Sequence, residues 1–114
     1  MPLIFKIMPA ALWDEALAQG VFRGAPVDLA DGYIHFSTDE QVRETAAKHF
    51  AGQGDLVLAA FPSEAFGADL VWEPSRGGAL FPHLYATLDP ATAVWARPLP
   101  LAADGRHVFP ELDA

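Results

Sequence analysis

The sequence predicts an α+β fold with two helices in its N-terminal half and a C-terminal third made mostly of strands. Apolar residues recur at helical spacing over residues 9–19 and 38–50, whereas short β-branched and aliphatic runs dominate after residue 55. Helices and strands are therefore segregated along the chain, which is typical of α+β proteins. A chain of 114 residues has the usual size of one domain, so residues 1–114 are predicted to form a single domain.

The first expected elements are a strand over Leu3–Ile7 and a helix over Pro9–Gln19. Gly20 is well placed to end this helix in a left-handed conformation. Residues 20–32 contain four glycines or prolines and two aspartates, which predicts a connecting loop. The larger apolar residues of the helix share one stripe: Leu12, Trp13, Ala16 and Leu17.

A second strand is expected over Tyr33–Phe36, followed by a helix over Thr38–Phe50. Ser37 and Glu40 form the S-x-x-E pattern, which predicts that Ser37 caps this helix. The near-continuous apolar run Asp55–Phe61 predicts a central strand covered on both faces. Three later strands are expected: Leu70–Trp72, Leu80–Tyr85 and Val94–Leu99.

Charge and composition exclude several functional classes. The formal net charge of −8 opposes binding to a nucleic acid, because that binding depends largely on clustered lysine and arginine. The chain has no cysteine, so it can form neither a disulfide framework nor a thiolate metal site. It also lacks an apolar run of the roughly 20 residues that span a bilayer. We therefore expect a cytoplasmic protein with a small-molecule ligand, no membrane association and no nucleic-acid partner; a protein partner stays unspecified.

Two strands each carry a histidine beside a tyrosine. Strand alternation places Tyr33, His35 and Ser37 on one face of the second strand, and His83 and Tyr85 share a face of a later one. If these strands are neighbours, both histidines face one cleft whose aromatic walls suit a planar ligand. The alternative is that both histidines are hydrogen-bonded within a packed layer.

Three further residues have two interpretations each. Glu73 precedes a glycine-containing loop, where its carboxylate either acts as a general base or is simply exposed beside a turn. Lys6 interrupts the first strand, and we interpret it as a charge on an edge strand, with a residue reaching into the site as the alternative. Arg76 is one of four arginines that would hold a phosphate if they converge. The histidine spacing matches no metal-ligand pattern, so no metal site is expected.

Several of these segments together resemble the bacterial domain-of-unknown-function family 952 over nearly the whole chain. They are Gly32–Ser37, His49-Phe50 at the end of its helix, the strand from Asp55, Trp72-Glu73, and Phe81–Tyr85. The resemblance implies a fold similar to the ADP-ribosyltransferases, in which a mixed, split β-sheet holds NAD in a cleft between two small sheets.

The resemblance also assigns roles by position. His35 stands where a tyrosine stacks on nicotinamide, His83 stands where a glutamate steadies the ribosyl cation, and Lys6 stands where the first strand carries a histidine. Glu73 is the candidate replacement for the missing carboxylate. The implied function is an ADP-ribosyltransferase-like or glycohydrolase-like enzyme that uses NAD or a related nucleotide. Its implied catalytic residues are His35, His83 and Glu73, and its implied nucleotide contacts are Lys6, Tyr33, Ser37, Arg76 and Tyr85.

Two alternatives come from other functional classes. The lysine at position 6 departs from the family pattern and favours a non-catalytic module that binds a small ligand. A structural or interaction domain would instead expose apolar surface, for example at Trp95 or Phe109.

Overall fold

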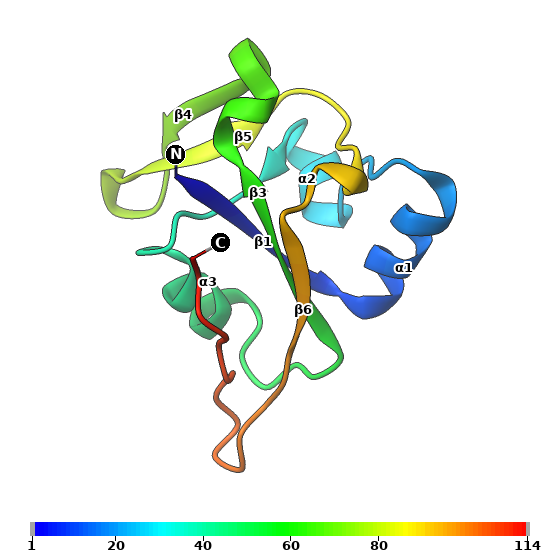
Figure 1. Ribbon diagram of the computed structural model, residues 1–114. Helices are drawn as coiled ribbons and strands as arrows, with labels where there is room; N and C mark the ends of the chain where they lie inside the picture. Colours follow the sequence, from blue (N-terminus) through cyan, green and yellow to red (C-terminus); the bar gives the residue numbers. More distant parts are fainter. Residues whose placement is uncertain (1, 114) are drawn as a thin grey trace.

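The computed structural model describes residues 2–113, apart from the side chain of Arg76. Within this range the chain forms two small antiparallel sheets and several helices, which confirms the α+β class (Figure 1). The helices are α1 Ala10–Gln19, α2 Pro26–Asp31 and α3 Val42–His49. The strands are β1 Leu3–Pro9, β2 Ile34–His35, β3 Leu56–Pro62, β4 Leu70–Pro74, β5 Leu80–Leu84 and β6 Trp95–Leu99.

The first sheet has the order β1-β3-β6, and its central strand β3 is the one that the apolar run predicts. Side chains alternate between its two faces, as the pleat requires. On β1, Ile4 and Met8 face one way, whereas Phe5 and Ile7 face the other. Both faces are covered, so every residue from Ile4 to Met8 is buried.

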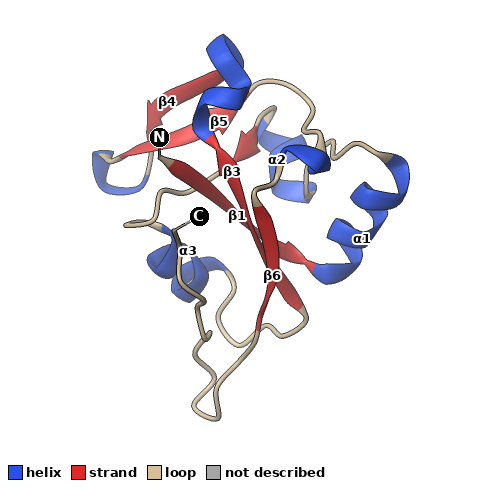
Figure 2. Cartoon of the chain, viewed as in Figure 1, coloured by secondary structure: helices blue, strands red, loops and turns tan. Residues whose placement is uncertain are grey.

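Two apolar clusters cover the two faces of this sheet. The first cluster also takes in α1 and the second sheet, and the second cluster takes in α3 (Figure 2). The first comprises Ile4, Met8, Trp13, Ala16, Phe22, Ile34, Phe36, Ala59, Phe61, Leu84 and Leu88. The second comprises Phe5, Ile7, Val42, Ala46, Leu56, Leu58, Ala60 and Leu99.

The second sheet has the order β2-β5-β4, and it joins the first sheet at a single point on β1. There Phe5 and Ser37 exchange two backbone hydrogen bonds of 2.8 and 2.9 Å, counted from N to O. Apart from this bridge, no strand of one sheet pairs with a strand of the other among the described residues. In β2 and β5, His35 and His83 are direct cross-strand partners, so the predicted neighbourhood of these two strands is confirmed.

Two predictions for local structure are wrong. Residues 20–32 are not only a loop, because α2 forms within them; its first residue is Pro26, whose fixed φ suits a helix start, and Gly32 follows it at φ 87°. The second main helix begins at Val42 and not at Thr38, so Ser37 does not cap it. Instead, the Ser37 hydroxyl lies 2.9 Å from the Thr45 hydroxyl.

Candidate functional site

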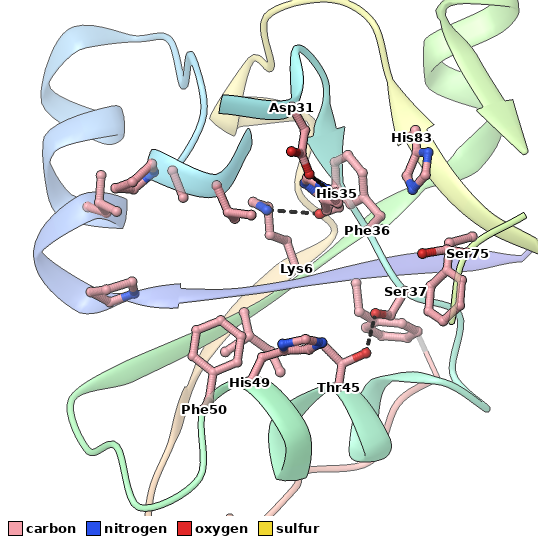
Figure 3. A pocket seen from close by; sticks show the side chains of 18 residues that line it. Lys6, Asp31, His35, Phe36, Ser37, Thr45, His49, Phe50, Ser75 and His83 are labelled. Carbon is pink, nitrogen blue, oxygen red and sulfur yellow. Dashed lines mark hydrogen bonds and ion pairs between the residues drawn. The ribbon is translucent and has the colours of Figure 1, made fainter. Parts of the chain in front are cut away.

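A cavity of about 550 Å³ lies along the outer edge of β1. Figure 3 shows β1 passing between α2 and β2 on one side and α3 on the other, and side chains from all four elements point into the space between them. The volume falls within the range of small-molecule sites. Most of the lining is apolar, and its polar members are Lys6, Asp31, His35, Ser37, Thr45, His49, Ser75 and His83.

Lys6 is buried at the base of this cavity with 5% of its side chain exposed. Its ammonium donates a 2.8 Å hydrogen bond to the carbonyl oxygen of His35 and lies 3.1 Å from a carboxylate oxygen of Asp28. Burial lowers the pKa of Lys6, and the charge of Asp28 opposes that effect. Our interpretation of Lys6 as an exposed edge-strand charge is wrong, because β1 is an edge strand but its lysine points inward and is paired.

Asp28, on α2, is the acid that balances Lys6. Its carboxylate also accepts hydrogen bonds from the backbone N–H groups of Ala25 and His35, at 2.7 and 3.1 Å. Burial raises the pKa of Asp28, but the hydrogen bond from His35, the charge of Lys6 and the two backbone donors outweigh it and lower the pKa to about 2. Asp28 is therefore an anion at neutral pH.

His35 lies between two carboxylates. Its Nδ1 is 2.7 Å from Asp28 and its Nε2 is 2.9 Å from Asp31. Asp28 is buried, whereas the Asp31 side chain is 46% exposed and borders the cavity. Both nitrogens of the ring are therefore engaged, and the ring orientation is fixed at both ends.

His83 lies beside His35, with 5.4 Å between the two ring centroids. Its ring is buried, and Nδ1 lies 2.8 Å from a carboxylate oxygen of Glu73. Among the described residues, Nε2 has no hydrogen-bond partner, although the ring borders the cavity. A buried polar atom is normally hydrogen-bonded, so this nitrogen is the strongest candidate in the cavity for contact with a ligand or water.

Glu73 connects His83 to Tyr85. One of its oxygens accepts hydrogen bonds from the Tyr85 hydroxyl at 2.7 Å and from His83 Nδ1. These two bonds, the one from Tyr85 first, lower the pKa of Glu73, and the same contact raises the pKa of Tyr85 to about 12. Tyr33 stacks on His83 with 4.1 Å between ring centroids, and burial raises its pKa.

Residues 7–96 match the family described as "Protein of unknown function (DUF952)". The chain belongs to this family. A search of curated proteins finds no match for this DUF952 chain. Among solved structures it is similar to the crystal structure of protein CC0527 from Caulobacter crescentus, with 55% identity, a TM-score of 0.89 and 93% of each chain covered. The solution NMR structure of CC0527 is also similar, with 56% identity, a TM-score of 0.84, and coverage of 93% of this chain and 91% of the other.

The structure brings together most of the residues that the sequence singled out, but in two layers. Lys6, His35, Ser37 and His83 border the cavity of the DUF952 chain. Tyr33, Glu73 and Tyr85 do not border it. Tyr33 and Glu73 contact the histidine rings, and Tyr85 contacts Glu73 and Tyr33. The side chain of Arg76 lies outside the described residues. Among those residues, no group of three or more acidic or histidine side chains is placed to hold a metal ion.

Asp28 and Asp31 are the acidic site residues that sequence reasoning missed. Both fall in the segment interpreted as a loop, where an aspartate needs no special explanation. The sequence did carry a signal for a short helix here: Pro26 suits a helix start, an acid follows two residues later, and Gly32 suits a helix end.

No helix in the described part of the chain is long and apolar enough to cross a membrane.

Proposed function

We propose that the cavity binds NAD or a related nucleotide, and that the chain is an ADP-ribosyltransferase-like or NAD glycohydrolase-like enzyme. The observation that carries the proposal is the unpartnered Nε2 of His83, which is buried beside a small-molecule-sized cavity. A nitrogen so placed serves as an acceptor for a ligand or as a base for a reacting water. The division of the strands into two small sheets supports the likeness to a split-sheet, NAD-binding fold, but both sheets are antiparallel, so the expectation of a mixed sheet is wrong.

In the hydrolytic form of this chemistry, the bond between the nicotinamide nitrogen and the ribose carbon breaks. The electron pair leaves with nicotinamide, and a water molecule adds to the resulting ribosyl cation. The proton of that water passes to solvent, so the products are nicotinamide, ADP-ribose and one proton. Glu73 accepts from Nδ1–H of His83 and so keeps the lone pair on Nε2, where it can accept a hydrogen bond from the substrate.

The ribosyl cation needs a nearby anion, and the cavity offers the carboxylate of Asp31. Glu73 is less suited to this task, because its contacts to His83 and Tyr85 lie behind the histidine ring and it does not border the cavity. We therefore assign Glu73 a positioning role through His83. We assign the contact with the cation to Asp31.

A thermal-shift titration tests ligand binding. NAD or ADP-ribose at one hundred times its Kd stabilises the native state by about 2.7 kcal/mol, a rise of roughly 10 °C for a domain of this size. His83→Phe keeps a ring against Tyr33 but removes both nitrogens, so we expect it to lose most of this ligand-dependent rise. The matched control is His107→Phe, whose ring bonds the Gln53 carbonyl outside the cavity. Equal ligand-dependent rises in melting temperature in His83→Phe and His107→Phe would mean that the ligand binds outside this cavity.

Nicotinamide release separates the enzyme from the second candidate, a non-catalytic binding module. That candidate is favoured by Lys6, whose ammonium is already bound to Asp28 and to the His35 carbonyl. If the chain is an enzyme, free nicotinamide accumulates over hours, and release falls at least tenfold in Asp31→Asn and in His83→Phe. Binding of NAD without any release of nicotinamide would mean that the chain is a non-catalytic binding module.

A further inference from the structure

The two cavity histidines have different numbers of acidic partners, and this difference has a chemical consequence. We propose that His35 is held as an imidazolium and His83 as a neutral ring, so that the cavity selects a ligand group that donates a hydrogen bond to His83 Nε2. The proposal rests on the proposed function only in placing a ligand in this cavity. The two protonation states can be measured without any ligand.

The charge of His35 follows from its two contacts. An ionised carboxylate can only accept a hydrogen bond, so the 2.7 Å contact between Asp28 and His35 Nδ1 requires a proton on Nδ1. The 2.9 Å contact between Asp31 and His35 Nε2 likewise requires a proton between the oxygen and the nitrogen. Asp31 is half exposed to water and can stay ionised at little cost, so the second proton belongs on the ring. His35 then has no lone pair and cannot accept a proton or a hydrogen bond from a ligand.

The neutrality of His83 follows from its single carboxylate. Glu73 is ionised and accepts from Tyr85, so its contact with His83 requires a proton on Nδ1. Nothing among the described residues accepts a second proton on Nε2, and a second positive charge there would lie beside the charged ring of His35. The Nε2 atom therefore keeps its lone pair.

The remaining charged and titratable groups around the pair agree with this division. Lys6, from β1, adds a positive charge behind the His35 backbone, and Asp28 neutralises it. Tyr33 contacts both rings, and its raised pKa keeps it neutral. The same holds for Tyr85, which lies on the Glu73 side of His83.

This arrangement predicts the class of ligand. A lone pair on His83 favours a ligand with an N–H or O–H group, such as a carboxamide or a hydroxyl, at the position that faces Nε2. A carboxylate at the same position would place two acceptors against each other and would be rejected. Nicotinamide and nicotinate are planar probes of almost equal shape: the first carries an N–H donor where the second carries a negatively charged acceptor.

The first experiment is a long-range ¹H–¹⁵N correlation on ligand-free, histidine-labelled protein at pH 7.5. His→Gln variants at positions 35, 49, 83 and 107 assign the four rings. We expect two protonated nitrogens on His35, and on His83 a protonated Nδ1 with a bare Nε2. A bare nitrogen on His35, or a bare Nδ1 on His83, would overturn the proposal.

A matched pair of variants tests the role of the second carboxylate. Asp31→Asn replaces an acceptor by an amide that can donate to Nε2, so His35 should lose one proton at pH 7.5 while the His83 pattern stays the same. Asp104→Asn removes an exposed carboxylate whose salt-bridge partner is Arg106, and should change neither ring. A His35 that stays doubly protonated in Asp31→Asn would contradict the two-carboxylate arrangement.

The second experiment compares the two probes on the same spectra. Nicotinamide should shift the Nε2 resonance of His83, and nicotinate should bind at least tenfold more weakly. Equal or tighter binding of nicotinate would overturn the inferred ligand class. If neither probe nor NAD itself shifts His83 while the nitrogen patterns are as expected, the protonation assignment is supported and NAD fails as the proposed ligand.

Discussion

Asp28 connects three segments that are far apart along the chain: β1 through Lys6, the start of α2 through the Ala25 amide, and β2 through His35. Its carboxylate is a buried anion whose stability depends on all of these donors at once. A buried ion pair contributes little in net terms compared with apolar residues of the same shape, but loss of one partner leaves an uncompensated charge. The contacts of Asp28 therefore predict large effects for single substitutions.

Lys6→Met removes the ammonium and keeps the length of the side chain. We expect a loss of about 3–5 kcal/mol in the free energy of unfolding, because the buried charge of Asp28 loses the ammonium that balances it and keeps only the His35 ring and two backbone donors. Urea unfolding at pH 7 measures this loss. In the double variant with Asp28→Asn, the loss should be smaller than the sum of the two single losses. Simple additivity would contradict direct coupling between the two side chains.

Stability should also depend on pH through Asp28. Its pKa falls from 3.8 to about 2 on folding, so the folded state favours the ionised form. This contribution is fully present above pH 4 and is lost as the pH falls from about 4 to about 2; a difference of this size amounts to about 2 kcal/mol. Urea midpoints between pH 5 and pH 2 should therefore fall less steeply in Asp28→Asn than in the parent. If the urea midpoint falls equally steeply with pH in both proteins, other carboxylates account for the pH dependence of stability.

The sequence allowed the histidines to be predicted as a facing pair but gave no sign of the charges around them. Alternation along two short strands gave each histidine its face, and the two face one cleft because the strands are neighbours, with His35 directly opposite His83. Lys6 could not be distinguished from an ordinary edge-strand lysine, because its partner lies 22 positions away. Long-range pairing of this kind depends on how α2 packs over β1, and no local pattern encodes it.

Helix α2 positions the acidic side of the cavity, although it is only 6 residues long. A helix this short has little stability of its own. It depends on Pro26 at its start, on the Asp28 carboxylate that accepts from Ala25, and on Gly32, which ends it with φ 87°. The same helix presents Asp31 to His35, so its local signals also control the site.

Gly32→Ala should therefore affect both stability and the site. A left-handed residue with a Cβ costs about 1–2 kcal/mol, and we expect that loss together with weaker binding of the proposed ligand, NAD, because Asp31 directly precedes Gly32. Gly20→Ala is the matched control: Gly20 has φ 74° at the end of α1, and neither glycine has an atom within 4 Å of an added Cβ. Similar destabilisation in both variants, with weaker binding only in Gly32→Ala, is the expected result in urea unfolding and thermal-shift titration. Equal ligand affinity in Gly32→Ala and Gly20→Ala would mean that α2 does not contribute to ligand binding.

Prediction of α3 shows where local signals are ambiguous. Ser37 and Glu40 satisfy a capping pattern, yet the helix starts four residues later than that pattern indicates. Ser37 pairs its backbone with Phe5 of β1, and the side chain of Gln41 accepts from the Thr38 amide instead. The tertiary contact with β1 therefore outweighs the local cap.

At the scale of the whole molecule, the first sheet joins the two apolar clusters into one structure. Strand β3 sends Phe61 into the first cluster and Leu58 into the second, and β1 does the same with Ile4 and Phe5. Neither cluster can lose its packing while these strands stay in place, because each strand forms part of both. If residues 1–114 form a single domain, as the sequence predicts, both clusters should therefore unfold together in one cooperative transition.

Trp13 and Trp95 report on the two clusters separately, since Trp13 belongs to the first and Trp95 packs against the second. Two single-tryptophan variants, each with the other two tryptophans replaced by phenylalanine, allow each cluster to be followed by fluorescence. In either variant the urea midpoint from fluorescence should equal the midpoint from far-ultraviolet circular dichroism, because a two-state domain has one transition for every probe. Comparing the two probes within one variant removes any effect of the substitutions on stability. A fluorescence midpoint for Trp13 or Trp95 that departs from the circular-dichroism midpoint would mean that one side of the sheet unfolds alone, and that the cavity edge along β1 is held by only one of the two clusters.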